Sequence, residues 1–542
     1  MLIRCSIVLL LSSLTWPTAA GAQAVTGTVE GRVTDAQGAV LPGVTITAVN
    51  TATATTFAGA TTSEGLYRIS FLPSGSYDIR AELSGFRTAT RQGAEVRVND
   101  SAVVDFSLVV GDVSETIVVE GASSGVQLTR SDLKRIYDEA ALKEINLPAS
   151  DATGRNVYAV ATKAPGVTTP GGRFGRAFLG SGGGNVVANG TTARSTNYEL
   201  DGISNIDPED NDYRTPVSIE GVREFEVLTA NYNAEFGRAG GAQVRAVSKS
   251  GTNAFHGSAF EYFYDNQRFQ SEATEVQARK CTADQISGLA TAPPGGCFAD
   301  FRTNLFGATA GGPALRDRLF YFAMFENNIR RGTNAATSTV PLATERTINT
   351  GSARGDAIVR EWLALYPLPN REAINPRRYQ ANVPFAYDTP NTFGRLDYNW
   401  SNSTRMMARY DFRNQDYKIT RIFRSNGGDI VDRAHTGGAT LTRVFSPNTL
   451  GEFRFGYGYR RVEVPTEREF ETFPTVTVTG FSTLGPISVQ YPIARQLYDL
   501  QGAGSITHTR GRHAYKAGYD LLGSRLVGAE SENGPYVDSG GR

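Results

Sequence analysis

Hydrophobic and polar residues alternate with a period of two along several segments of the second half of the chain. The clearest segment is GEFRFGYGYRR at 451–461, where one face carries Phe453, Phe455, Tyr457 and Tyr459 and the other carries Glu452, Arg454, Gly456, Gly458 and Arg460. Three further segments repeat it: Phe260, Tyr262 and Tyr264 opposite Glu261; Leu396, Tyr398 and Trp400 opposite Arg395, Asp397 and Asn399; and Met406, Ala408, Tyr410 and Phe412 opposite Arg405, Arg409, Asp411 and Arg413. A period of two predicts β-strands.

Because the charges are confined to one face, the two faces of these strands are expected to meet different environments. A water-soluble sandwich can also alternate, but recurrence with charges on a single face is typical of strands that face lipid on one side and a polar interior on the other. An Arg or Lys on the lipid face near the bilayer midplane costs roughly 2–4 kcal/mol, and no backbone group is left unpaired in lipid. We therefore expect an antiparallel transmembrane sheet with its charges inside. After the N-terminus, no apolar run is long enough for a spanning helix.

The N-terminus has the layout of a secretory signal peptide, which we place at 1–24. Arg4 precedes an apolar run at 7–14, and small residues end at Ala22. An uncleaved anchor is the alternative, but the run is too short to span a bilayer. The sequence predicts that the mature protein leaves the cytoplasm.

Composition excludes some classes of partner and limits the cysteine chemistry. The chain has 54 basic and 54 acidic residues, which gives no basic surface for nucleic acid. Cys5 leaves with the signal peptide, so Cys281 and Cys297 remain in one Pro- and Gly-rich loop. In an oxidising compartment we expect them to form a disulfide, with two unrelated thiols as the alternative.

Residues 25–110 predict a small antiparallel β-sandwich. Short strands are separated by the turn signals DAQG at 35–38, SEG at 63–65, LPSG at 72–75 and SGF at 84–86. This segment closely resembles the carboxypeptidase regulatory-like domain. The resemblance is carried by the sequence GRVTDAQGAVLPGVTITAVNTAT, followed by TTSEGLYRISFLPSGSYDIRAELSGF. That resemblance implies a transthyretin-like or Ig-like fold, similarly placed ahead of many outer-membrane receptors.

The residues do not support an enzyme. No histidine occurs before His256, so this domain cannot supply a His-based zinc site, and the four histidines of the chain are scattered. The chain has no Walker loop. We expect no catalytic residues, no metal and no cofactor, although a secreted metallopeptidase is a third hypothesis that bound zinc would support.

A linker at 111–123 contains a short β-prone run. Its residues Glu115, Thr116, Ile117, Val118 and Val119 resemble a TonB box, which implies that a TonB-type energy-transducing protein pairs with them. An extended segment on a tether can add itself as a strand to a partner's sheet. An ordinary edge strand or linker is the alternative.

Residues 124–252 carry a mixed pattern. SDLKRIYDEAALKEIN at 131–146 predicts a helix with Ser131 as its N-cap, and NYELDGISN, VREFEVLTA and GAQVRAVSKSGTN predict strands. The segment resembles the plug of TonB-dependent receptors, and SKSGTNAFHGSAFEYF is similar to the Oar-like branch. The resemblance is carried by Leu200, Asp201, Gly202, Glu224, Phe225, Glu226, Val227, Glu235, Phe236, Gly237, Gly240 and Gly241.

The glycines of this segment favour tight packing and turns. A plug inside a barrel needs positive φ and close approach between chain segments, although a hairpin in any sheet is the alternative. Asp201 in LDG is expected to form a turn rather than bind a ligand.

Residues 253–542 predict part of a transmembrane β-barrel. About ten strand candidates follow Ala254, separated by irregular stretches at 270–300 and 331–390. The family resemblance implies 22 strands, which at roughly ten residues each need about 220 residues. The 289 residues from 254 to 542 cannot hold these strands and such long loops as well, and the chain ends in polar YVDSGGR. We therefore expect a C-terminally truncated barrel.

The leading hypothesis is a mainly β TonB-dependent receptor of the Oar-like type. It would lie in the outer membrane lipid with its N-terminal domain in the periplasm, and would import or sense an unidentified extracellular ligand. The alternative is an outer-membrane-anchored adhesion or surface-assembly protein.

Overall fold

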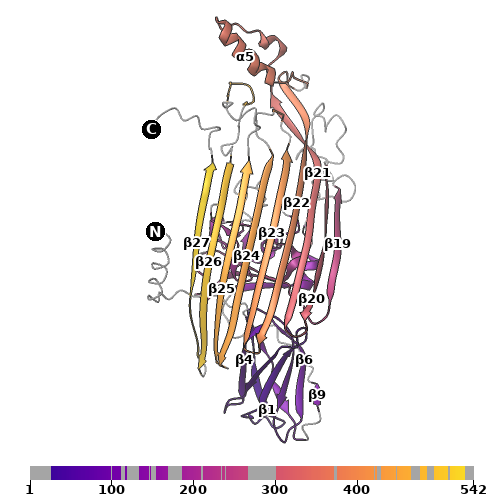
Figure 1. Cartoon of the computed structure of the whole chain (residues 1–542), viewed down its shortest axis with the longest axis vertical. Coiled ribbons are helices and arrows are strands. Elements are labelled where there is room, and N and C mark those ends of the chain that lie inside the picture. Colours follow the sequence, from indigo (N-terminus) through magenta and orange to yellow (C-terminus); the bar gives the residue numbers. More distant parts are fainter. Residues whose placement is uncertain are drawn as a thin grey trace.

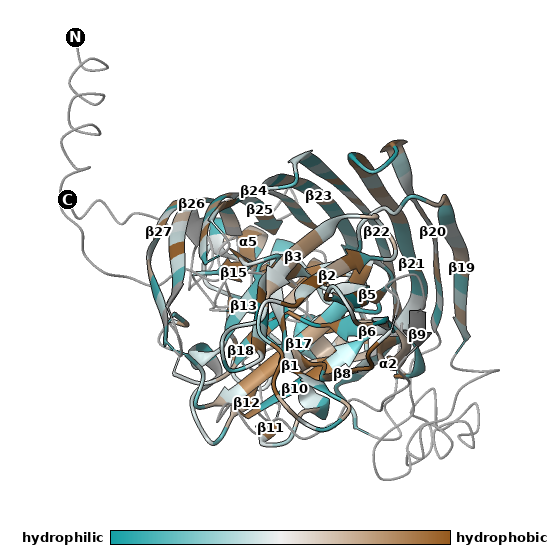
Figure 2. Ribbon diagram, turned by 90° about the horizontal axis from the view of Figure 1, so that it is seen from below, coloured by the Kyte–Doolittle hydropathy of each residue, from teal (hydrophilic) through white to brown (hydrophobic). Residues whose placement is uncertain are grey.

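The computed structural model describes residues 26–98, 100–111, 116–118, 133–145, 147, 154–168, 186–208, 212–233, 235–237, 240–265, 301–370, 375–419, 422–423, 429–446, 448–464, 476–484, 493–510 and 513–530. Three parts follow one another along the chain: an N-terminal sandwich, a plug and a wall of long strands. The sandwich lies at one end of the wall, and the plug lies against its concave side (Figures 1 and 2). The predicted mainly β fold is confirmed.

Two sheets form the N-terminal sandwich. The first has the order β4-β1-β7, with β8 also paired to β1, and the second has the order β3-β2-β5-β6-β9. The strands are β1 (Thr26–Asp35), β2 (Thr45–Asn50), β3 (Thr56–Ala60), β4 (Leu66–Pro73), β5 (Gly75–Glu82), β6 (Thr88–Val96), β7 (Ser101–Val103), β8 (Phe106–Leu108) and β9 (Thr116–Val118). Alternate residues of β5 turn inward, so Tyr77, Ile79 and Ala81 are fully buried.

The turn signals of the sandwich act as the sequence predicts. The Asp35 carboxylate accepts hydrogen bonds from the backbone N–H groups of Gln37 and Ala39, at 2.9 and 2.8 Å. Gly38 has φ +88°, a conformation that favours glycine. These contacts reverse the chain after β1.

The plug contains a five-stranded sheet with the order β10-β17-β18-β13-β14 and two small ribbons, β11-β12 and β15-β16. Its elements are β10 (Leu133–Asp138), α2 (Glu139–Glu144), η2 (Val157–Lys163), β11 (Val167–Thr168), β12 (Val187–Ala188), η4 (Ala193–Ser195), β13 (Asn197–Leu200), β14 (Ile203–Ser204), β15 (Ile206–Asp207), β16 (Asp212–Tyr213), η5 (Ile219–Gly221), β17 (Val222–Ala230) and β18 (Gln243–Ser248). Its apolar core includes Tyr158, Tyr198 and Phe225.

The helix predicted at 131–146 is wrong over its first half. Leu133–Asp138 forms β10, which pairs with β17, and the helix covers only Glu139–Glu144. Its N-cap is Asp138, whose side chain accepts from the Ala141 N–H at 2.9 Å, and the predicted N-cap Ser131 lies outside the described residues. Pairing with a neighbouring strand outweighs the helical spacing of the apolar residues.

In the described part of the chain, nine antiparallel strands form the strand wall, and each is paired with its neighbours in sequence. They are β19 (His256–Asp265), β20 (Phe301–Leu315), β21 (Leu319–Thr339), β22 (Arg378–Ser401), β23 (Thr404–Ile419), β24 (Ile430–Ser446), β25 (Thr449–Val464), β26 (Ile493–Arg510) and β27 (His513–Glu530). The wall curves around the plug, and β19 and β27 are its two ends (Figure 2). In the part of the chain that is described, no helix is long and apolar enough to cross a membrane.

In β22, β23 and β25 the aromatic and charged residues lie on the two faces that the alternation in sequence predicts. Phe453 and Phe455 lie exposed on the convex side, and Arg409 and Arg454 are buried on the side of the plug. Strand β19 is the exception, because Tyr262 donates a hydrogen bond from its hydroxyl to Glu220 of the plug, at 2.9 Å. Tyr262 and Tyr264 therefore face inward, whereas Glu261 and Phe263 are exposed on the other face, which is the reverse of the prediction.

The predicted irregular stretch at 331–390 is mostly regular. Strands β21 and β22 remain paired from Leu319↔Tyr398 to Thr339↔Arg378, so the hairpin continues well past its neighbours. Between them lie η6 (Ala343–Arg346) and α5 (Ala353–Leu365), and α5 caps the far end (Figure 1). The sequence GTNAATST is polar on both faces and gives no alternation, although its backbone pairs normally.

Candidate functional site

The contact between the plug and the wall begins at a tight turn that joins β13 to β14. Asp201 and Gly202 both have positive φ, +52° and +73°, so Asp201 does form the predicted turn. Its carboxylate also binds two arginines of the wall, Arg409 at 3.2 Å and Arg395 at 3.4 Å. Asp201 therefore joins the plug to the wall, a role that the turn signal alone does not indicate.

The arginines at this turn are themselves held by wall carboxylates. Arg395 pairs with Asp397 at 2.7 Å and Arg409 with Asp411 at 2.8 Å, each two residues along the same strand face. Arg409 also donates to the Leu200 carbonyl at 3.0 Å. Spacing of i and i+2 on a strand places both members on one face, so the pattern R-x-D is a sequence signal for such inward pairs.

A second buried cluster lies further along the plug. Arg460 binds Asp432 through two nitrogens, at 3.0 and 2.8 Å, and reaches Asp207 of the plug at 2.7 Å. Arg495 lies 3.8 Å from the same Asp207 carboxylate. Arg214 of the plug pairs with Asp499 of the wall. A buried carboxylate needs such partners, because desolvation of an unpaired charge costs several kcal/mol.

Glycines of the wall make room for the plug. A Cβ atom at Gly438 would lie 2.3 Å from Ile203, and one at Gly456 would lie 2.6 Å from the same side chain. Ile203 of β14 therefore fits between β24 and β25, where side chains are absent. The alternation in sequence places Gly456 on the polar face of its strand, but it does not predict the contact of Gly456 with the plug.

Glu224 and Phe225 of the predicted plug motif lie on opposite faces of β17. Phe225 is in the apolar core, with its ring 6.2 Å from that of Tyr137. Glu224 is buried against the sandwich and accepts from the Val98 N–H at 3.2 Å. Burial, with a smaller effect of the Glu226 charge, raises the pKa of Glu224 to about 7, although the Val98 N–H, Arg223 and Arg97 oppose the shift.

The glycines of the predicted plug motif differ in what they do. A Cβ atom at Gly241 would lie 2.8 Å from the Ser195 carbonyl oxygen, which is the close approach expected. Among the described residues, Gly237 and Gly240 have neither positive φ nor a neighbour within 4 Å of a Cβ position. Neither predicted reason for a glycine applies to those two positions.

The sandwich also contacts the wall and the start of β19. Ala52 accepts from the Asn253 N–H at 2.9 Å, and Thr55 lies 3.2 Å from the Asn399 amide nitrogen. Arg405 lies over the Phe57 ring, 4.5 Å from its centroid. We call the meeting point of sandwich, plug and wall the three-way joint. No sequence signal predicted it.

Comparison with known families agrees with this architecture. Residues 247–540 match the family described as outer membrane beta barrel domain, which is more than half of the chain. The protein belongs to this outer-membrane β-barrel family. Residues 28–109 match the carboxypeptidase regulatory-like domain. The strand wall is thus a part of an outer-membrane barrel, and the predicted resemblance of the sandwich is confirmed.

One curated relative of this family member is the TonB-dependent transporter Oar of Myxococcus xanthus. The two chains are 29% identical over 337 residues, which cover 60% of this chain and 28% of Oar. The protein therefore spans less than a third of the length of that relative. The predicted Oar-like resemblance is confirmed.

Solved structures of similar architecture are more distant in sequence. The outer membrane transporter YddB of Escherichia coli has a TM-score of 0.48 at 10% identity, covering 72% of this chain and 48% of its own. The ferric enterobactin receptor PfeA of Pseudomonas aeruginosa has a TM-score of 0.42 at 12% identity, covering 72% of this chain and 49% of its own.

Several predicted site residues of this outer-membrane protein are only partly described. Thr116–Val118 forms β9, which pairs in parallel with β6 at the edge of the sandwich, whereas Glu115 and Val119 lie outside the described residues. The signal peptide, Cys281 and Cys297 also lie outside them. Within the described ranges no cluster of His, Cys, Asp and Glu could hold a metal ion. The disulfide and the boundaries at 110, 123 and 252 stay predictions.

Proposed function

We propose that this chain is part of a TonB-dependent outer-membrane transporter or receptor whose N-terminal sandwich lies in the periplasm. The observation that carries the proposal is the plug, held against the inner face of the wall by buried ion pairs at Asp201 and Asp207. A plug attached by charged groups can separate from a wall, because water and neighbouring charges replace the lost partners. An apolar interface would offer no such replacement.

The energy for such a movement would come through a partner. The chain has no nucleotide-binding loop, so force transmitted from an inner-membrane complex is the simplest source. The similarity to Oar supports a TonB-type protein as that partner. A ligand at the extracellular side would bias the plug toward movement, which the partner then completes.

The segment Glu115–Val119 is our candidate for the TonB box. Its central residues already form a strand, and within the described residues three pairs join that strand to β6. So short a ladder has few hydrogen bonds to lose, and its release would free an extended segment for strand addition to a partner. A segment at the periplasmic end of the wall is also within reach of a periplasmic protein.

Deletion of residues 115–119 in the full-length protein tests the proposal. The measurement is binding of the purified protein in detergent to the periplasmic domain of the host's TonB-type protein. We expect the deletion to abolish binding, because it removes the strand that pairs. A matched deletion of 121–125, GASSG, removes the same number of residues where the linker meets the plug and should leave binding intact.

The rival function, adhesion or surface assembly, predicts a different outcome. If the 115–119 deletion leaves both TonB binding and surface display unchanged while cell adhesion depends on the sandwich, the transporter proposal is wrong. Surface display must be checked in both deletions, so that loss of folding is not taken for loss of pairing.

A further inference from the structure

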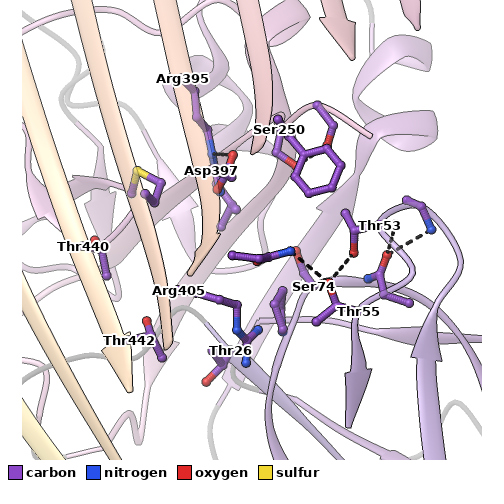
Figure 3. A pocket seen from close by; sticks show the side chains of 18 of the residues that line it. Thr26, Thr53, Thr55, Ser74, Ser250, Arg395, Asp397, Arg405, Thr440 and Thr442 are labelled. Atoms are coloured by element: carbon purple, nitrogen blue, oxygen red, sulfur yellow. Dashed lines mark hydrogen bonds and ion pairs between the residues drawn. The ribbon is translucent and has the colours of Figure 1, made fainter. Parts of the chain in front are cut away.

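A cavity of about 170 Å³ lies at the three-way joint. The sandwich contributes hydroxyl groups, the plug contributes Ser250, and neighbouring wall strands contribute Arg405, Thr440 and Thr442 (Figure 3). The volume is enough for several water molecules or one small ion. Because all three parts of the chain line it, its contents affect how they fit together.

Arg405 brings a positive charge to this cavity. It lies near the start of β23, opposite Thr442 of β24. Its guanidinium faces the Phe57 ring at 4.5 Å, and its Nη2 atom is buried without a hydrogen-bond partner. Among the described residues, no carboxylate lies within ion-pair distance of Arg405.

The carboxylates that line the cavity are paired with other arginines. Asp397 pairs with Arg395 at 2.7 Å. Asp201 pairs with Arg409 at 3.2 Å, and Glu452 with Arg454 at 3.2 Å. Each of these acids lies within ion-pair distance of one of these arginines, and none of the pairs includes Arg405. Arg223 of β17 and Arg395 of β22 also line the cavity, so three guanidinium groups border it.

A second unpartnered polar atom lies close to Arg405 along the wall. Thr440 Oγ1 is buried without a hydrogen-bond partner, and Thr440 pairs with Met407, two residues beyond Arg405. By this register the Arg405 and Thr440 side chains project from the same face of adjacent strands. A hydroxyl and a guanidinium both donate, so together they suit a group with several acceptor oxygens.

We propose that the cavity binds a small oxyanion, a phosphate or a carboxylate, with Arg405 as its principal ligand. A guanidinium binds both groups through paired N–H donors. Water in the cavity would satisfy the hydrogen bonds of Arg405 but would give it no ion-pair partner, whereas an anion does both. Bound there, the anion links sandwich, plug and wall. This site stands independently of the proposed transport function.

Titration of the purified protein in detergent with inorganic phosphate, and separately with acetate, tests the site by calorimetry. Sodium chloride keeps the ionic strength constant, because surface charges respond to salt. We expect saturable binding of at least one of these anions. Arg405→Gln should weaken that binding about tenfold or more, since a hydrogen bond to a charged group is lost with the charge. Thr440→Val should weaken it less.

Two variants separate anion binding from folding. Arg443→Gln removes an exposed arginine that also lies over a phenylalanine, Phe445, on the strand next to Arg405, and it should leave the affinity unchanged. Arg405→Lys keeps the charge and should retain part of the affinity even if Arg405→Gln fails to fold.

Each result decides the proposal. Binding of one anion alone identifies its chemistry, phosphate or carboxylate, and supports the site provided that Arg405→Gln or Thr440→Val weakens it. No saturable binding of either anion would mean that only solvent fills the cavity. Equal binding by the wild type, Arg405→Gln and Thr440→Val would place the anion elsewhere, and either result overturns the proposal.

Discussion

The sandwich and the strand wall use the same alternation of side chains in opposite senses. In the sandwich, Tyr77 and Ile79 turn inward and are fully buried, and the polar residues face water. In the wall, Phe455 turns outward and is 54% exposed, while Arg460 turns inward and is 2% exposed. The period of two fixes which residues share a face, but the surrounding solvent decides which face is apolar. Substitutions matched between the two regions test this comparison.

The largest effect is expected at Arg460→Met. This change leaves two buried carboxylates, Asp207 and Asp432, whose remaining arginines lie 3.8 Å away. We expect the free energy of unfolding to fall by about 3–5 kcal/mol, measured by urea titration in detergent. Arg461→Met is the control, since its pair with Glu463 is exposed and contributes at most about 1 kcal/mol. Equal losses would contradict a charged interior.

Ile79→Ala tests the apolar core of the sandwich. Ile79 is fully buried, so the truncation removes apolar contact and leaves a cavity. We expect a loss of about 2–5 kcal/mol in the unfolding of the sandwich, followed by thermal melting. Leu521→Ala, on the convex side of the wall, leaves no cavity and should have a much smaller effect. A loss at Leu521 as large as that at Ile79 would mean that the wall's convex face is packed against protein.

Phe455→Arg and Val103→Arg compare the two exposed apolar surfaces directly. Both side chains are 54% exposed, one on the wall and one on the sandwich. In lipid bilayers we expect Phe455→Arg to lower the stability by about 2–4 kcal/mol if it lies near the midplane. Val103→Arg faces water and should change the stability by about 0.5 kcal/mol or less. Similar small effects for both would mean that the wall does not face hydrocarbon.

The smallest expected change in stability concerns Glu224, which lies at the contact between the sandwich and the plug. Its pKa is raised to about 7, so the folded protein holds this proton more tightly than the unfolded chain does. The contribution of Glu224 to stability is therefore fully present at low pH and falls as the pH rises from about 4.5 to 7. The span of roughly 2.5 units corresponds to at most about 3.4 kcal/mol.

Replacement of Glu224 by Gln should remove this pH dependence. The variant should match the wild type at pH 4 and be more stable at pH 8, as measured by urea midpoints across that range. Gln still accepts the hydrogen bond from Val98. The exposed Glu82→Gln in β5 serves as the control for the loss of a surface carboxylate. A difference between Glu224→Gln and wild type that is the same at every pH would refute the assignment.

Particular elements show where sequence reasoning succeeded and where it failed. Alternation placed Arg395, Arg409 and Arg454 on the inner face, because a strand offers only two faces and charge is expelled from lipid. The helical spacing of apolar residues gave a wrong prediction for β10, because β17 supplies a strand partner there. Alternation reversed the faces of β19, because the charges of the plug, such as Glu220, attract the Tyr262 hydroxyl.

By itself, the sequence determined the order of sandwich, plug and wall, the turns of the sandwich and the faces of most wall strands. These features depend on neighbours in the chain, on periodicity and on the cost of burying charge. Only the tertiary structure decided that Asp201 binds Arg395 and Arg409, that Ile203 fits beside Gly438, and that Arg405 reaches a cavity shared by three parts. Those contacts join residues hundreds of positions apart, and no local pattern records which distant side chains the fold brings together.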